Sequence, residues 1–169
     1  MQKLNSLLCF IDKISEWTGK IVSFLVIGSI IVVLIEVVAR YFFNNPTVWG
    51  WEMSLFLFGG AVMLGGAYTL LHGSHVKMDV AYARLSVRAR AILDVITFIF
   101  FLVFVVIMIW KSGYVAVKAI EFMEKTESPW GPVIWPSRIA ITIGAFLLLL
   151  QGIAKFVRDI LIITGREHS

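Results

Sequence analysis

The sequence has a single cysteine, Cys9, and only three histidines, so it is poor in two residue types that enzymes often use in catalysis. One cysteine cannot form a disulfide within the chain, and it argues against a thiol relay, which needs at least a pair. The sequence also has no glycine-rich phosphate loop, no serine–histidine–aspartate set and no cysteine–histidine spacing typical of a metal site. We therefore expect no enzymatic activity, no bound metal and no cofactor in this chain.

Charged residues are scarce as well. They make up 15% of the chain, whereas soluble domains carry about 25%. A helix that crosses a bilayer needs about 20 apolar residues, and the chain has four such runs, at approximately 21–39, 53–71, 92–110 and 139–156. The sequence therefore predicts an all-α, multi-pass membrane protein in which residues 1–169 form one membrane domain.

The N-terminal segment, residues 1–19, lacks the apolar core and the small-residue cleavage site of a signal peptide. Its apolar residues recur at helical spacing, and they include Leu4, Leu7, Leu8 and Ile11. This pattern predicts an amphipathic helix that lies in the plane of the membrane interface. The alternative is a simple N-terminal extension of the first span.

Lysine and arginine are more frequent in the N-terminal segment, the second connection and the C-terminal segment than in the first and third connections. Positively charged loops stay on the cytoplasmic side of a membrane, so both termini are expected to be cytoplasmic. The net charge of +4 fits contact with anionic lipid head groups. It is not evidence for nucleic acid as a partner.

Three charged residues, Glu36, Arg40 and Glu52, lie where the first two apolar runs meet. Glu36 and Arg40 are four residues apart and can pair on one face of a helix, and Glu52 is expected to join them across a short turn at Asn44–Pro46. Charges near the bilayer core are costly and are usually paired or functional. We favour a structural clamp between the first two helices, with an ion path as the alternative.

The other polar residues favour local, structural roles. His75 and Asp79 are four residues apart in the second connection and are expected to pair there, with a haem or metal role for His72 and His75 as the alternative. Asp94 follows Arg90 by four residues and is expected to pair with it.

Several residues predict where the helices begin, end and touch. Ser86 could cap the third helix, whose apolar pattern continues past residue 110, and Pro136 suits the first turn of the fourth. The glycine pairs at residues 59–60 and 65–66 suit close helix–helix contact.

The order of these motifs resembles a known family. The motifs are Glu36-x-x-x-Arg40-Tyr-Phe, then Trp49-x-x-Glu52, then a glycine-containing helix, then Gly-x-His75-Val-Lys77-x-Asp79, and finally Trp-Pro before the last helix. The sequence is similar in this respect to the small membrane subunit of tripartite ATP-independent periplasmic (TRAP) transporters. The resemblance runs through nearly the whole chain, and Lys77 stands where the family commonly has a basic residue.

The resemblance implies a partner system in a bacterial inner membrane. A periplasmic binding protein would capture an organic acid, such as a dicarboxylate, a sugar acid or sialic acid, and a large membrane subunit would carry it inward with sodium. The small subunit would brace the large one and would hold no complete transport site. The third connection would then lie on the periplasmic side, and four of its charged residues are candidate contacts for the binding protein: Lys118, Glu121, Glu124 and Lys125.

Two other functions remain open from the sequence. A small multidrug exporter also has four helices and a glutamate in the first, but it keeps that acid unpaired near the middle of the membrane, whereas Glu36 lies beside Arg40. A membrane-anchor subunit of a redox enzyme would use histidines to hold a haem.

Overall fold

A computed structural model describes residues 2–73 and 86–164, and everything below concerns those residues. Four helices make up nearly all of them: α1 (Gln2–Phe42), α2 (Gly50–Leu71), α4 (Val87–Glu121) and α5 (Trp135–Ile163). Each of the four is long and apolar enough to cross a membrane, and no strand occurs in the described part of the chain. The prediction of an all-helical protein with four spans is confirmed.

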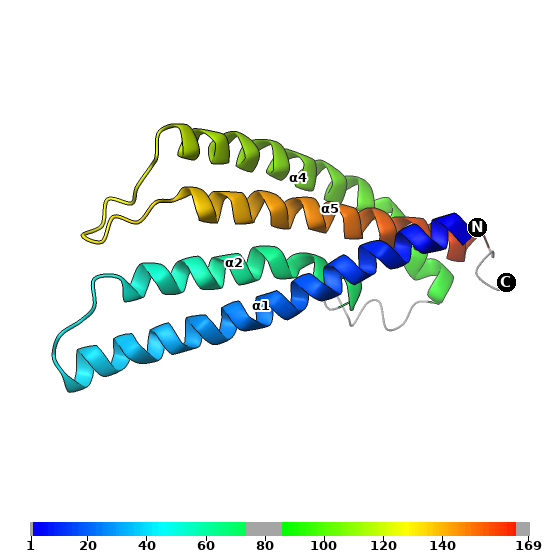
Figure 1. The fold of residues 1–169 in the computed structure, drawn as a ribbon. Helices are drawn as coiled ribbons and strands as arrows, with labels where there is room; N and C mark the ends of the chain where they lie inside the picture. Colours follow the sequence, from blue (N-terminus) through cyan, green and yellow to red (C-terminus); the bar gives the residue numbers. More distant parts are fainter. Residues whose placement is uncertain (1, 74–85, 165–169) are drawn as a thin grey trace.

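The helices lie in the spatial order α1, α2, α5, α4, so that α2 and α5 are central and α1 and α4 are outermost. Figure 1 shows that the connections α1–α2 and α4–α5 are at one end of the molecule, and that both termini are at the other. Near the termini the first part of α1 also reaches α5. One end of the bundle is therefore joined by two loops and the other by direct contact between helices.

The first helix differs from the sequence prediction. Residues 2–42 form one continuous helix of 41 residues, about 60 Å long, so residues 2–19 are not a helix of their own. They extend the first span at its N-terminal end, which was the alternative to a separate interfacial helix. The physical reason is that no glycine–proline break or capping pair separates this segment from the span.

The helix ends follow local chemistry. The side chain of Ser86 caps α4 by accepting a hydrogen bond of 3.3 Å from the backbone N–H of Ala89, as predicted, and α5 has its proline in the first turn. α1 ends at the expected turn, where Asn44 has a φ of +48°. The N–H of Asn45 then donates to the carbonyl of Ala39 at 3.0 Å, which is how such turns satisfy the last helical carbonyls.

Small side chains allow the central helices to pack closely. A Cβ atom on Gly144 of α5 would lie 2.4 Å from the carbonyl oxygen of Met63 in α2, so the two backbones touch at this point. By contrast, Gly59, which the sequence suggested as a packing residue, has nothing near its missing side chain. Among the apolar residues that the structure describes, those that are fully buried are alanines and Val105, whereas large ones such as Phe24 (74% exposed) and Phe100 (76% exposed) point outward from α1 and α4.

Candidate functional site

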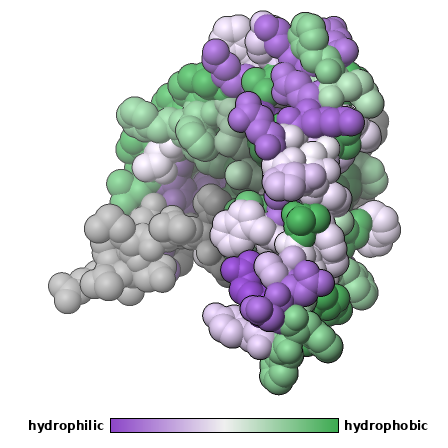
Figure 2. All heavy atoms as spheres, turned by 90° about the vertical axis from the view of Figure 1, so that its left-hand side faces the viewer, coloured by the Kyte–Doolittle hydropathy of each residue, from purple (hydrophilic) through white to green (hydrophobic). Residues whose placement is uncertain are grey.

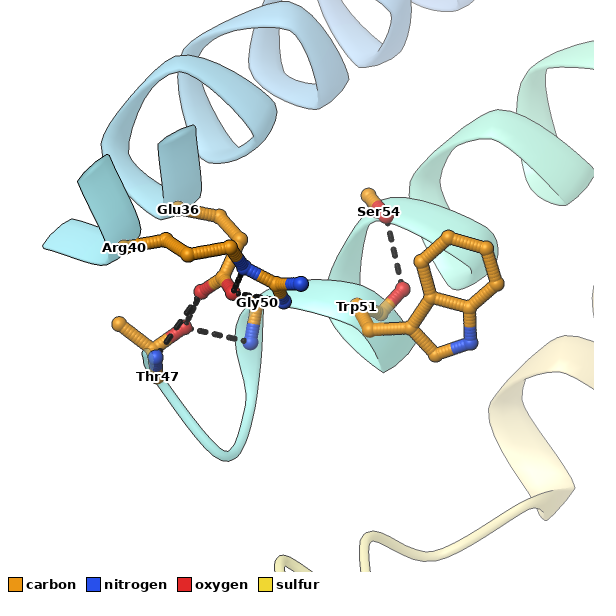
Figure 3. A network of polar contacts seen from close by, with 6 residues as sticks. All are labelled: Glu36, Arg40, Thr47, Gly50, Trp51 and Ser54. Carbon is orange, nitrogen blue, oxygen red and sulfur yellow. Dashed lines mark hydrogen bonds and ion pairs between the residues drawn. The ribbon is translucent and has the colours of Figure 1, made fainter. Parts of the chain in front are cut away.

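The predicted pair of Glu36 and Arg40 is present at the end of α1 (Figure 3). The guanidinium group of Arg40 donates to Oε1 of Glu36 through Nη2 at 2.6 Å and through Nε at 3.2 Å. The Glu36 side chain is only 13% exposed, whereas that of Arg40 is 57% exposed. The carboxylate is therefore enclosed by the protein, and the arginine lies on its outer side.

The second oxygen of Glu36 is held by Thr47, a residue that the sequence analysis did not single out. The backbone N–H of Thr47 donates to Oε2 at 3.0 Å, and its hydroxyl donates to the same oxygen. The hydroxyl oxygen also accepts from the N–H of Gly50 at 3.1 Å, and a Cβ atom on Gly50 would lie 2.9 Å from Oε2. Glu36 thus ties the end of α1 to the connection and to the first residue of α2, as Figure 3 shows.

Glu52 takes part in a different contact. Its Oε2 accepts a hydrogen bond of 3.2 Å from the hydroxyl of Thr126 in the α4–α5 connection. Trp49 occupies the N-cap position of α2 without a side-chain cap and is half-buried, whereas Trp51 is 70% exposed and points away from Glu36 (Figure 3). The prediction that Glu52 joins Glu36 and Arg40 is therefore wrong. α2 directs the Glu52 side chain toward the α4–α5 connection instead.

The α4–α5 connection is a small hairpin. The N–H of Thr126 donates to the carbonyl of Pro132, and the N–H of Ile134 donates to the carbonyl of Glu124, both at 3.0 Å. The hydroxyl of Ser128 accepts from the N–H of Gly131 at 3.1 Å. Through Thr126 this hairpin is fastened to Glu52 in the first turn of α2.

The four charged residues suggested as docking contacts lie at or next to this hairpin. Lys118, Glu121 and Lys125 are exposed, and Glu124 is half-buried. The ammonium group of Lys118 lies 4.7 Å from the centre of the Tyr114 ring. Figure 2, which faces the end with both connections, shows hydrophilic side chains gathered there in purple between hydrophobic flanks in green. These residues are thus accessible, and their docking role stays a prediction.

A second polar network, missed in the sequence, joins α1 to α5 near the termini. The hydroxyl of Ser15 donates to Oε1 of Gln151 at 2.7 Å, and Nε2 of Gln151 donates to Oδ1 of Asp12 at 3.1 Å. Arg158 forms an ion pair with the other oxygen of Asp12. Ser15 and Gln151 are each only 1% exposed. A glutamine inside an apolar run was the one signal that could have pointed to this network.

Lys155 extends the polar contacts from α5 to α4. Its ammonium group pairs with Asp94 of α4 and, at 2.7 Å, with Asp159 one turn further along α5. Asp94 therefore has a partner on another helix, and its expected pairing with Arg90 stays a prediction. In the described residues, every fully buried side-chain nitrogen or oxygen has a hydrogen-bond partner.

The described residues do not form a group of three or more histidine, cysteine, aspartate or glutamate side chains that could hold a metal. His72 directs Nδ1 to the carbonyl oxygen of Tyr68 at 3.1 Å. His75, Lys77 and Asp79 lie outside the described residues. What the arrangement does is join helices: one network fastens α1 to α2, one fastens α2 to the α4–α5 hairpin, and one fastens α1 and α4 to α5.

Four apolar helices of this length with pairwise polar contacts define a multi-pass membrane protein without an evident catalytic centre among the described residues. Residues 29–161 match the family model described as tripartite ATP-independent periplasmic transporters, DctQ component. The chain therefore belongs to the DctQ component family, and it is a transporter component rather than an enzyme. No curated protein matches the sequence closely. Members of this family work with a large membrane subunit and a periplasmic binding protein.

Proposed function

We propose that this chain is the scaffold subunit of a TRAP transporter and that it braces the large membrane subunit. The observation that carries the proposal is the exposure of large apolar side chains along both outermost helices, such as Phe24 on α1 and Phe100 on α4. The buried polar side chains Ser15 and Gln151, in contrast, bond to each other between α1 and α5. A protein built in this way offers a large apolar surface to neighbours in the membrane.

The Glu36 network supports a structural role in particular. One oxygen of Glu36 accepts from Arg40, and the other accepts twice from Thr47. A carboxylate that is held on both oxygens is poorly placed to cycle protons, which speaks against the multidrug-exporter alternative. The family match speaks against a membrane anchor of a redox enzyme.

The transporter of which the chain is a part would take up an organic acid with sodium: a dicarboxylate, a sugar acid or sialic acid. The sodium site would belong to the large subunit. In this proposal both termini are in the cytoplasm of a bacterium and the chain lies in the inner membrane. The end of α4, with Lys118 and Glu121, and the hairpin, with Glu124 and Lys125, then face the periplasm, where the binding protein arrives.

Affinity purification from native membranes tests the proposal. The tagged chain is solubilised in mild detergent, and the proteins that accompany it are identified by mass spectrometry. We expect a much larger polytopic membrane protein in a fixed ratio to the chain. A chain that purifies alone, and that transports a solute alone in proteoliposomes, would refute the scaffold role.

A further inference from the structure

One face of α1 carries a repeat of apolar residues, most of which the fold leaves exposed. Its side chains recur with a spacing of seven residues: Phe10, Trp17, Phe24, Ile31 and Val38. A second set precedes the first by three residues and runs from Leu7 to Phe42, with Gly28 as its one small member. Two apolar sets in this alternation form the a and d positions of a heptad pattern, by which long helices pack side by side. We call these two sets the outer seam.

Most of the outer seam is exposed, but Ile14 and Gly28 are half-buried, and Gly28 faces Leu57 of α2. Phe10 is 62% exposed, Trp17 68%, Phe24 74% and Phe42 81%. The inward face of the same helix holds the residues that contact the rest of the chain, including Ser15, which is 1% exposed and bonded to Gln151. The Asp12–Arg158 pair fixes the rotation of α1 about its own axis. The seam therefore points outward because the opposite face is fastened to α5.

The length of the seam argues for a protein rather than lipid as its cover. From Leu7 to Phe42 the seam extends about 53 Å along the helix, whereas the hydrocarbon layer is about 30 Å thick. A helix would have to tilt by roughly 55° to place the whole seam in that layer, and tilts range up to about 40°. Part of the seam must therefore lie outside the hydrocarbon, where lipid tails do not cover it.

The charges beside the seam indicate what kind of helix fits. Lys13 and Lys20 are exposed and directly precede seam residues, which places them at the flanking positions that select partners in heptad packing. Two copies of the chain in one membrane would run parallel, and the lysines of one would then face Thr18 and Leu25 of the other. Neither is acidic, so a second copy offers no charge match, whereas a different helix with acidic flanking residues does.

A hollow at the other end of the seam suits such packing. It has a volume of about 330 Å³ and is lined by apolar side chains that include Ile35 and Val38 of the seam itself. Side chains of a neighbouring helix insert into hollows of this kind. We infer that a long helix of the large membrane subunit, apolar along one face and with acidic residues opposite Lys13 and Lys20, packs along the outer seam of α1. This inference rests on the proposed function for its partner.

Site-specific photocrosslinking in the purified complex of both membrane subunits tests the inference. Benzoylphenylalanine is placed in turn at Phe10, Trp17 and Phe24, and, as matched positions on the opposite outer helix, at Phe100 (76% exposed) and Phe104 (62% exposed). After irradiation, we expect adducts with peptides of the large subunit from the three α1 positions, in heptad register along one of its helices. The α4 positions are expected to give lipid adducts.

Charge reversal supplies a second readout. In the double variant Lys13→Glu with Lys20→Glu, we expect about tenfold less large subunit to accompany the chain. Lys111→Glu, an exposed lysine on α4, is expected to leave that yield unchanged.

The outcomes separate the two proposals. An intact complex in which α1 gives only lipid adducts, adducts between two copies of this chain, or large-subunit adducts only from α4 overturns the outer seam as the interface. The scaffold function survives each of those results. If no large subunit accompanies the unmodified chain, the proposed function itself fails.

Discussion

Gln151 accepts a hydrogen bond of 2.7 Å from Ser15, a residue 136 positions away in the sequence, and both side chains are almost completely buried. This contact places the N-terminal part of α1 against the middle of α5. It also makes α1 a structural member of the bundle over nearly its whole length.

Replacing Gln151 by leucine tests how much this contact stabilises the bundle. The Gln151→Leu variant leaves the buried hydroxyl of Ser15 without its acceptor, and an unsatisfied buried polar group costs about 1–3 kcal/mol. We expect a lower midpoint of thermal unfolding in detergent. Ser54→Ala is the matched control, because Ser54 bonds only to a carbonyl of its own helix. Equal midpoints for both variants would show that the α1–α5 contact does not stabilise the bundle.

The contact of α2 with α5 depends on the absence of a side chain at Gly144. In Gly144→Ala the new methyl group would lie 2.4 Å from the backbone oxygen of Met63, which forces the two helices apart at a cost of about 1–3 kcal/mol. Gly59→Ala has open space around it and gains helix propensity, about 0.5–1 kcal/mol. We expect the two alanine variants to shift the unfolding midpoint in opposite directions. A shift in the same direction would contradict the close approach of α2 and α5.

We expect the Glu36 network to hold α1 and α2 together and not to transfer protons. Glu36→Gln keeps an oxygen that can accept from Thr47 but removes the titratable group, so we expect transport by the assembled system to be retained. Glu36→Ala removes both the accepting oxygen and the titratable group, and we expect a lower yield of the assembled complex. The measurements are solute uptake and the recovery of the large subunit for each variant. Loss of uptake in Glu36→Gln with the complex intact would favour an ion path.

The hydrogen bond from Thr126 to Glu52 fastens the α4–α5 hairpin to α2. In Thr126→Val the hydroxyl contacts with Glu52 and with Ser128 are both lost while the bulk is kept, so the hairpin should open more often. Hydrogen exchange at the amides of Thr126 and Ile134, which bond across the hairpin, is expected to become faster. Glu127→Gln, an exposed side chain on the same hairpin, serves as the control. Unchanged exchange in Thr126→Val would mean that Glu52 does not hold the hairpin.

Features that depend on neighbours in the sequence could be predicted from it. The four helices follow from apolar runs, the cap of α4 follows from Ser86, and the Glu36–Arg40 pair follows from its spacing of four residues. The cap and the ion pair are each complete within about one helical turn, and each helix depends only on its own apolar run. The spatial arrangement of the helices is not required for any of them.

Contacts between helices could not be predicted, because they depend on the order α1, α2, α5, α4. Glu52 was expected beside Glu36, which is close in sequence, but it bonds to Thr126, 74 residues away. The Asp12–Arg158 pair joins residues 146 positions apart. Nothing in an isolated sequence says that the N-terminal segment of α1 meets α5, and a polar stripe there is equally suited to facing water.

The central claim is that this chain braces a transporter without transporting by itself, and reconstituted uptake tests it most directly. Proteoliposomes are prepared with the large subunit, the binding protein and a sodium gradient, either with or without this chain, and uptake of the organic acid is followed over time. The account predicts sodium-driven uptake only when this chain and the large subunit are both present. Full uptake without this chain, or uptake by this chain alone, would contradict it.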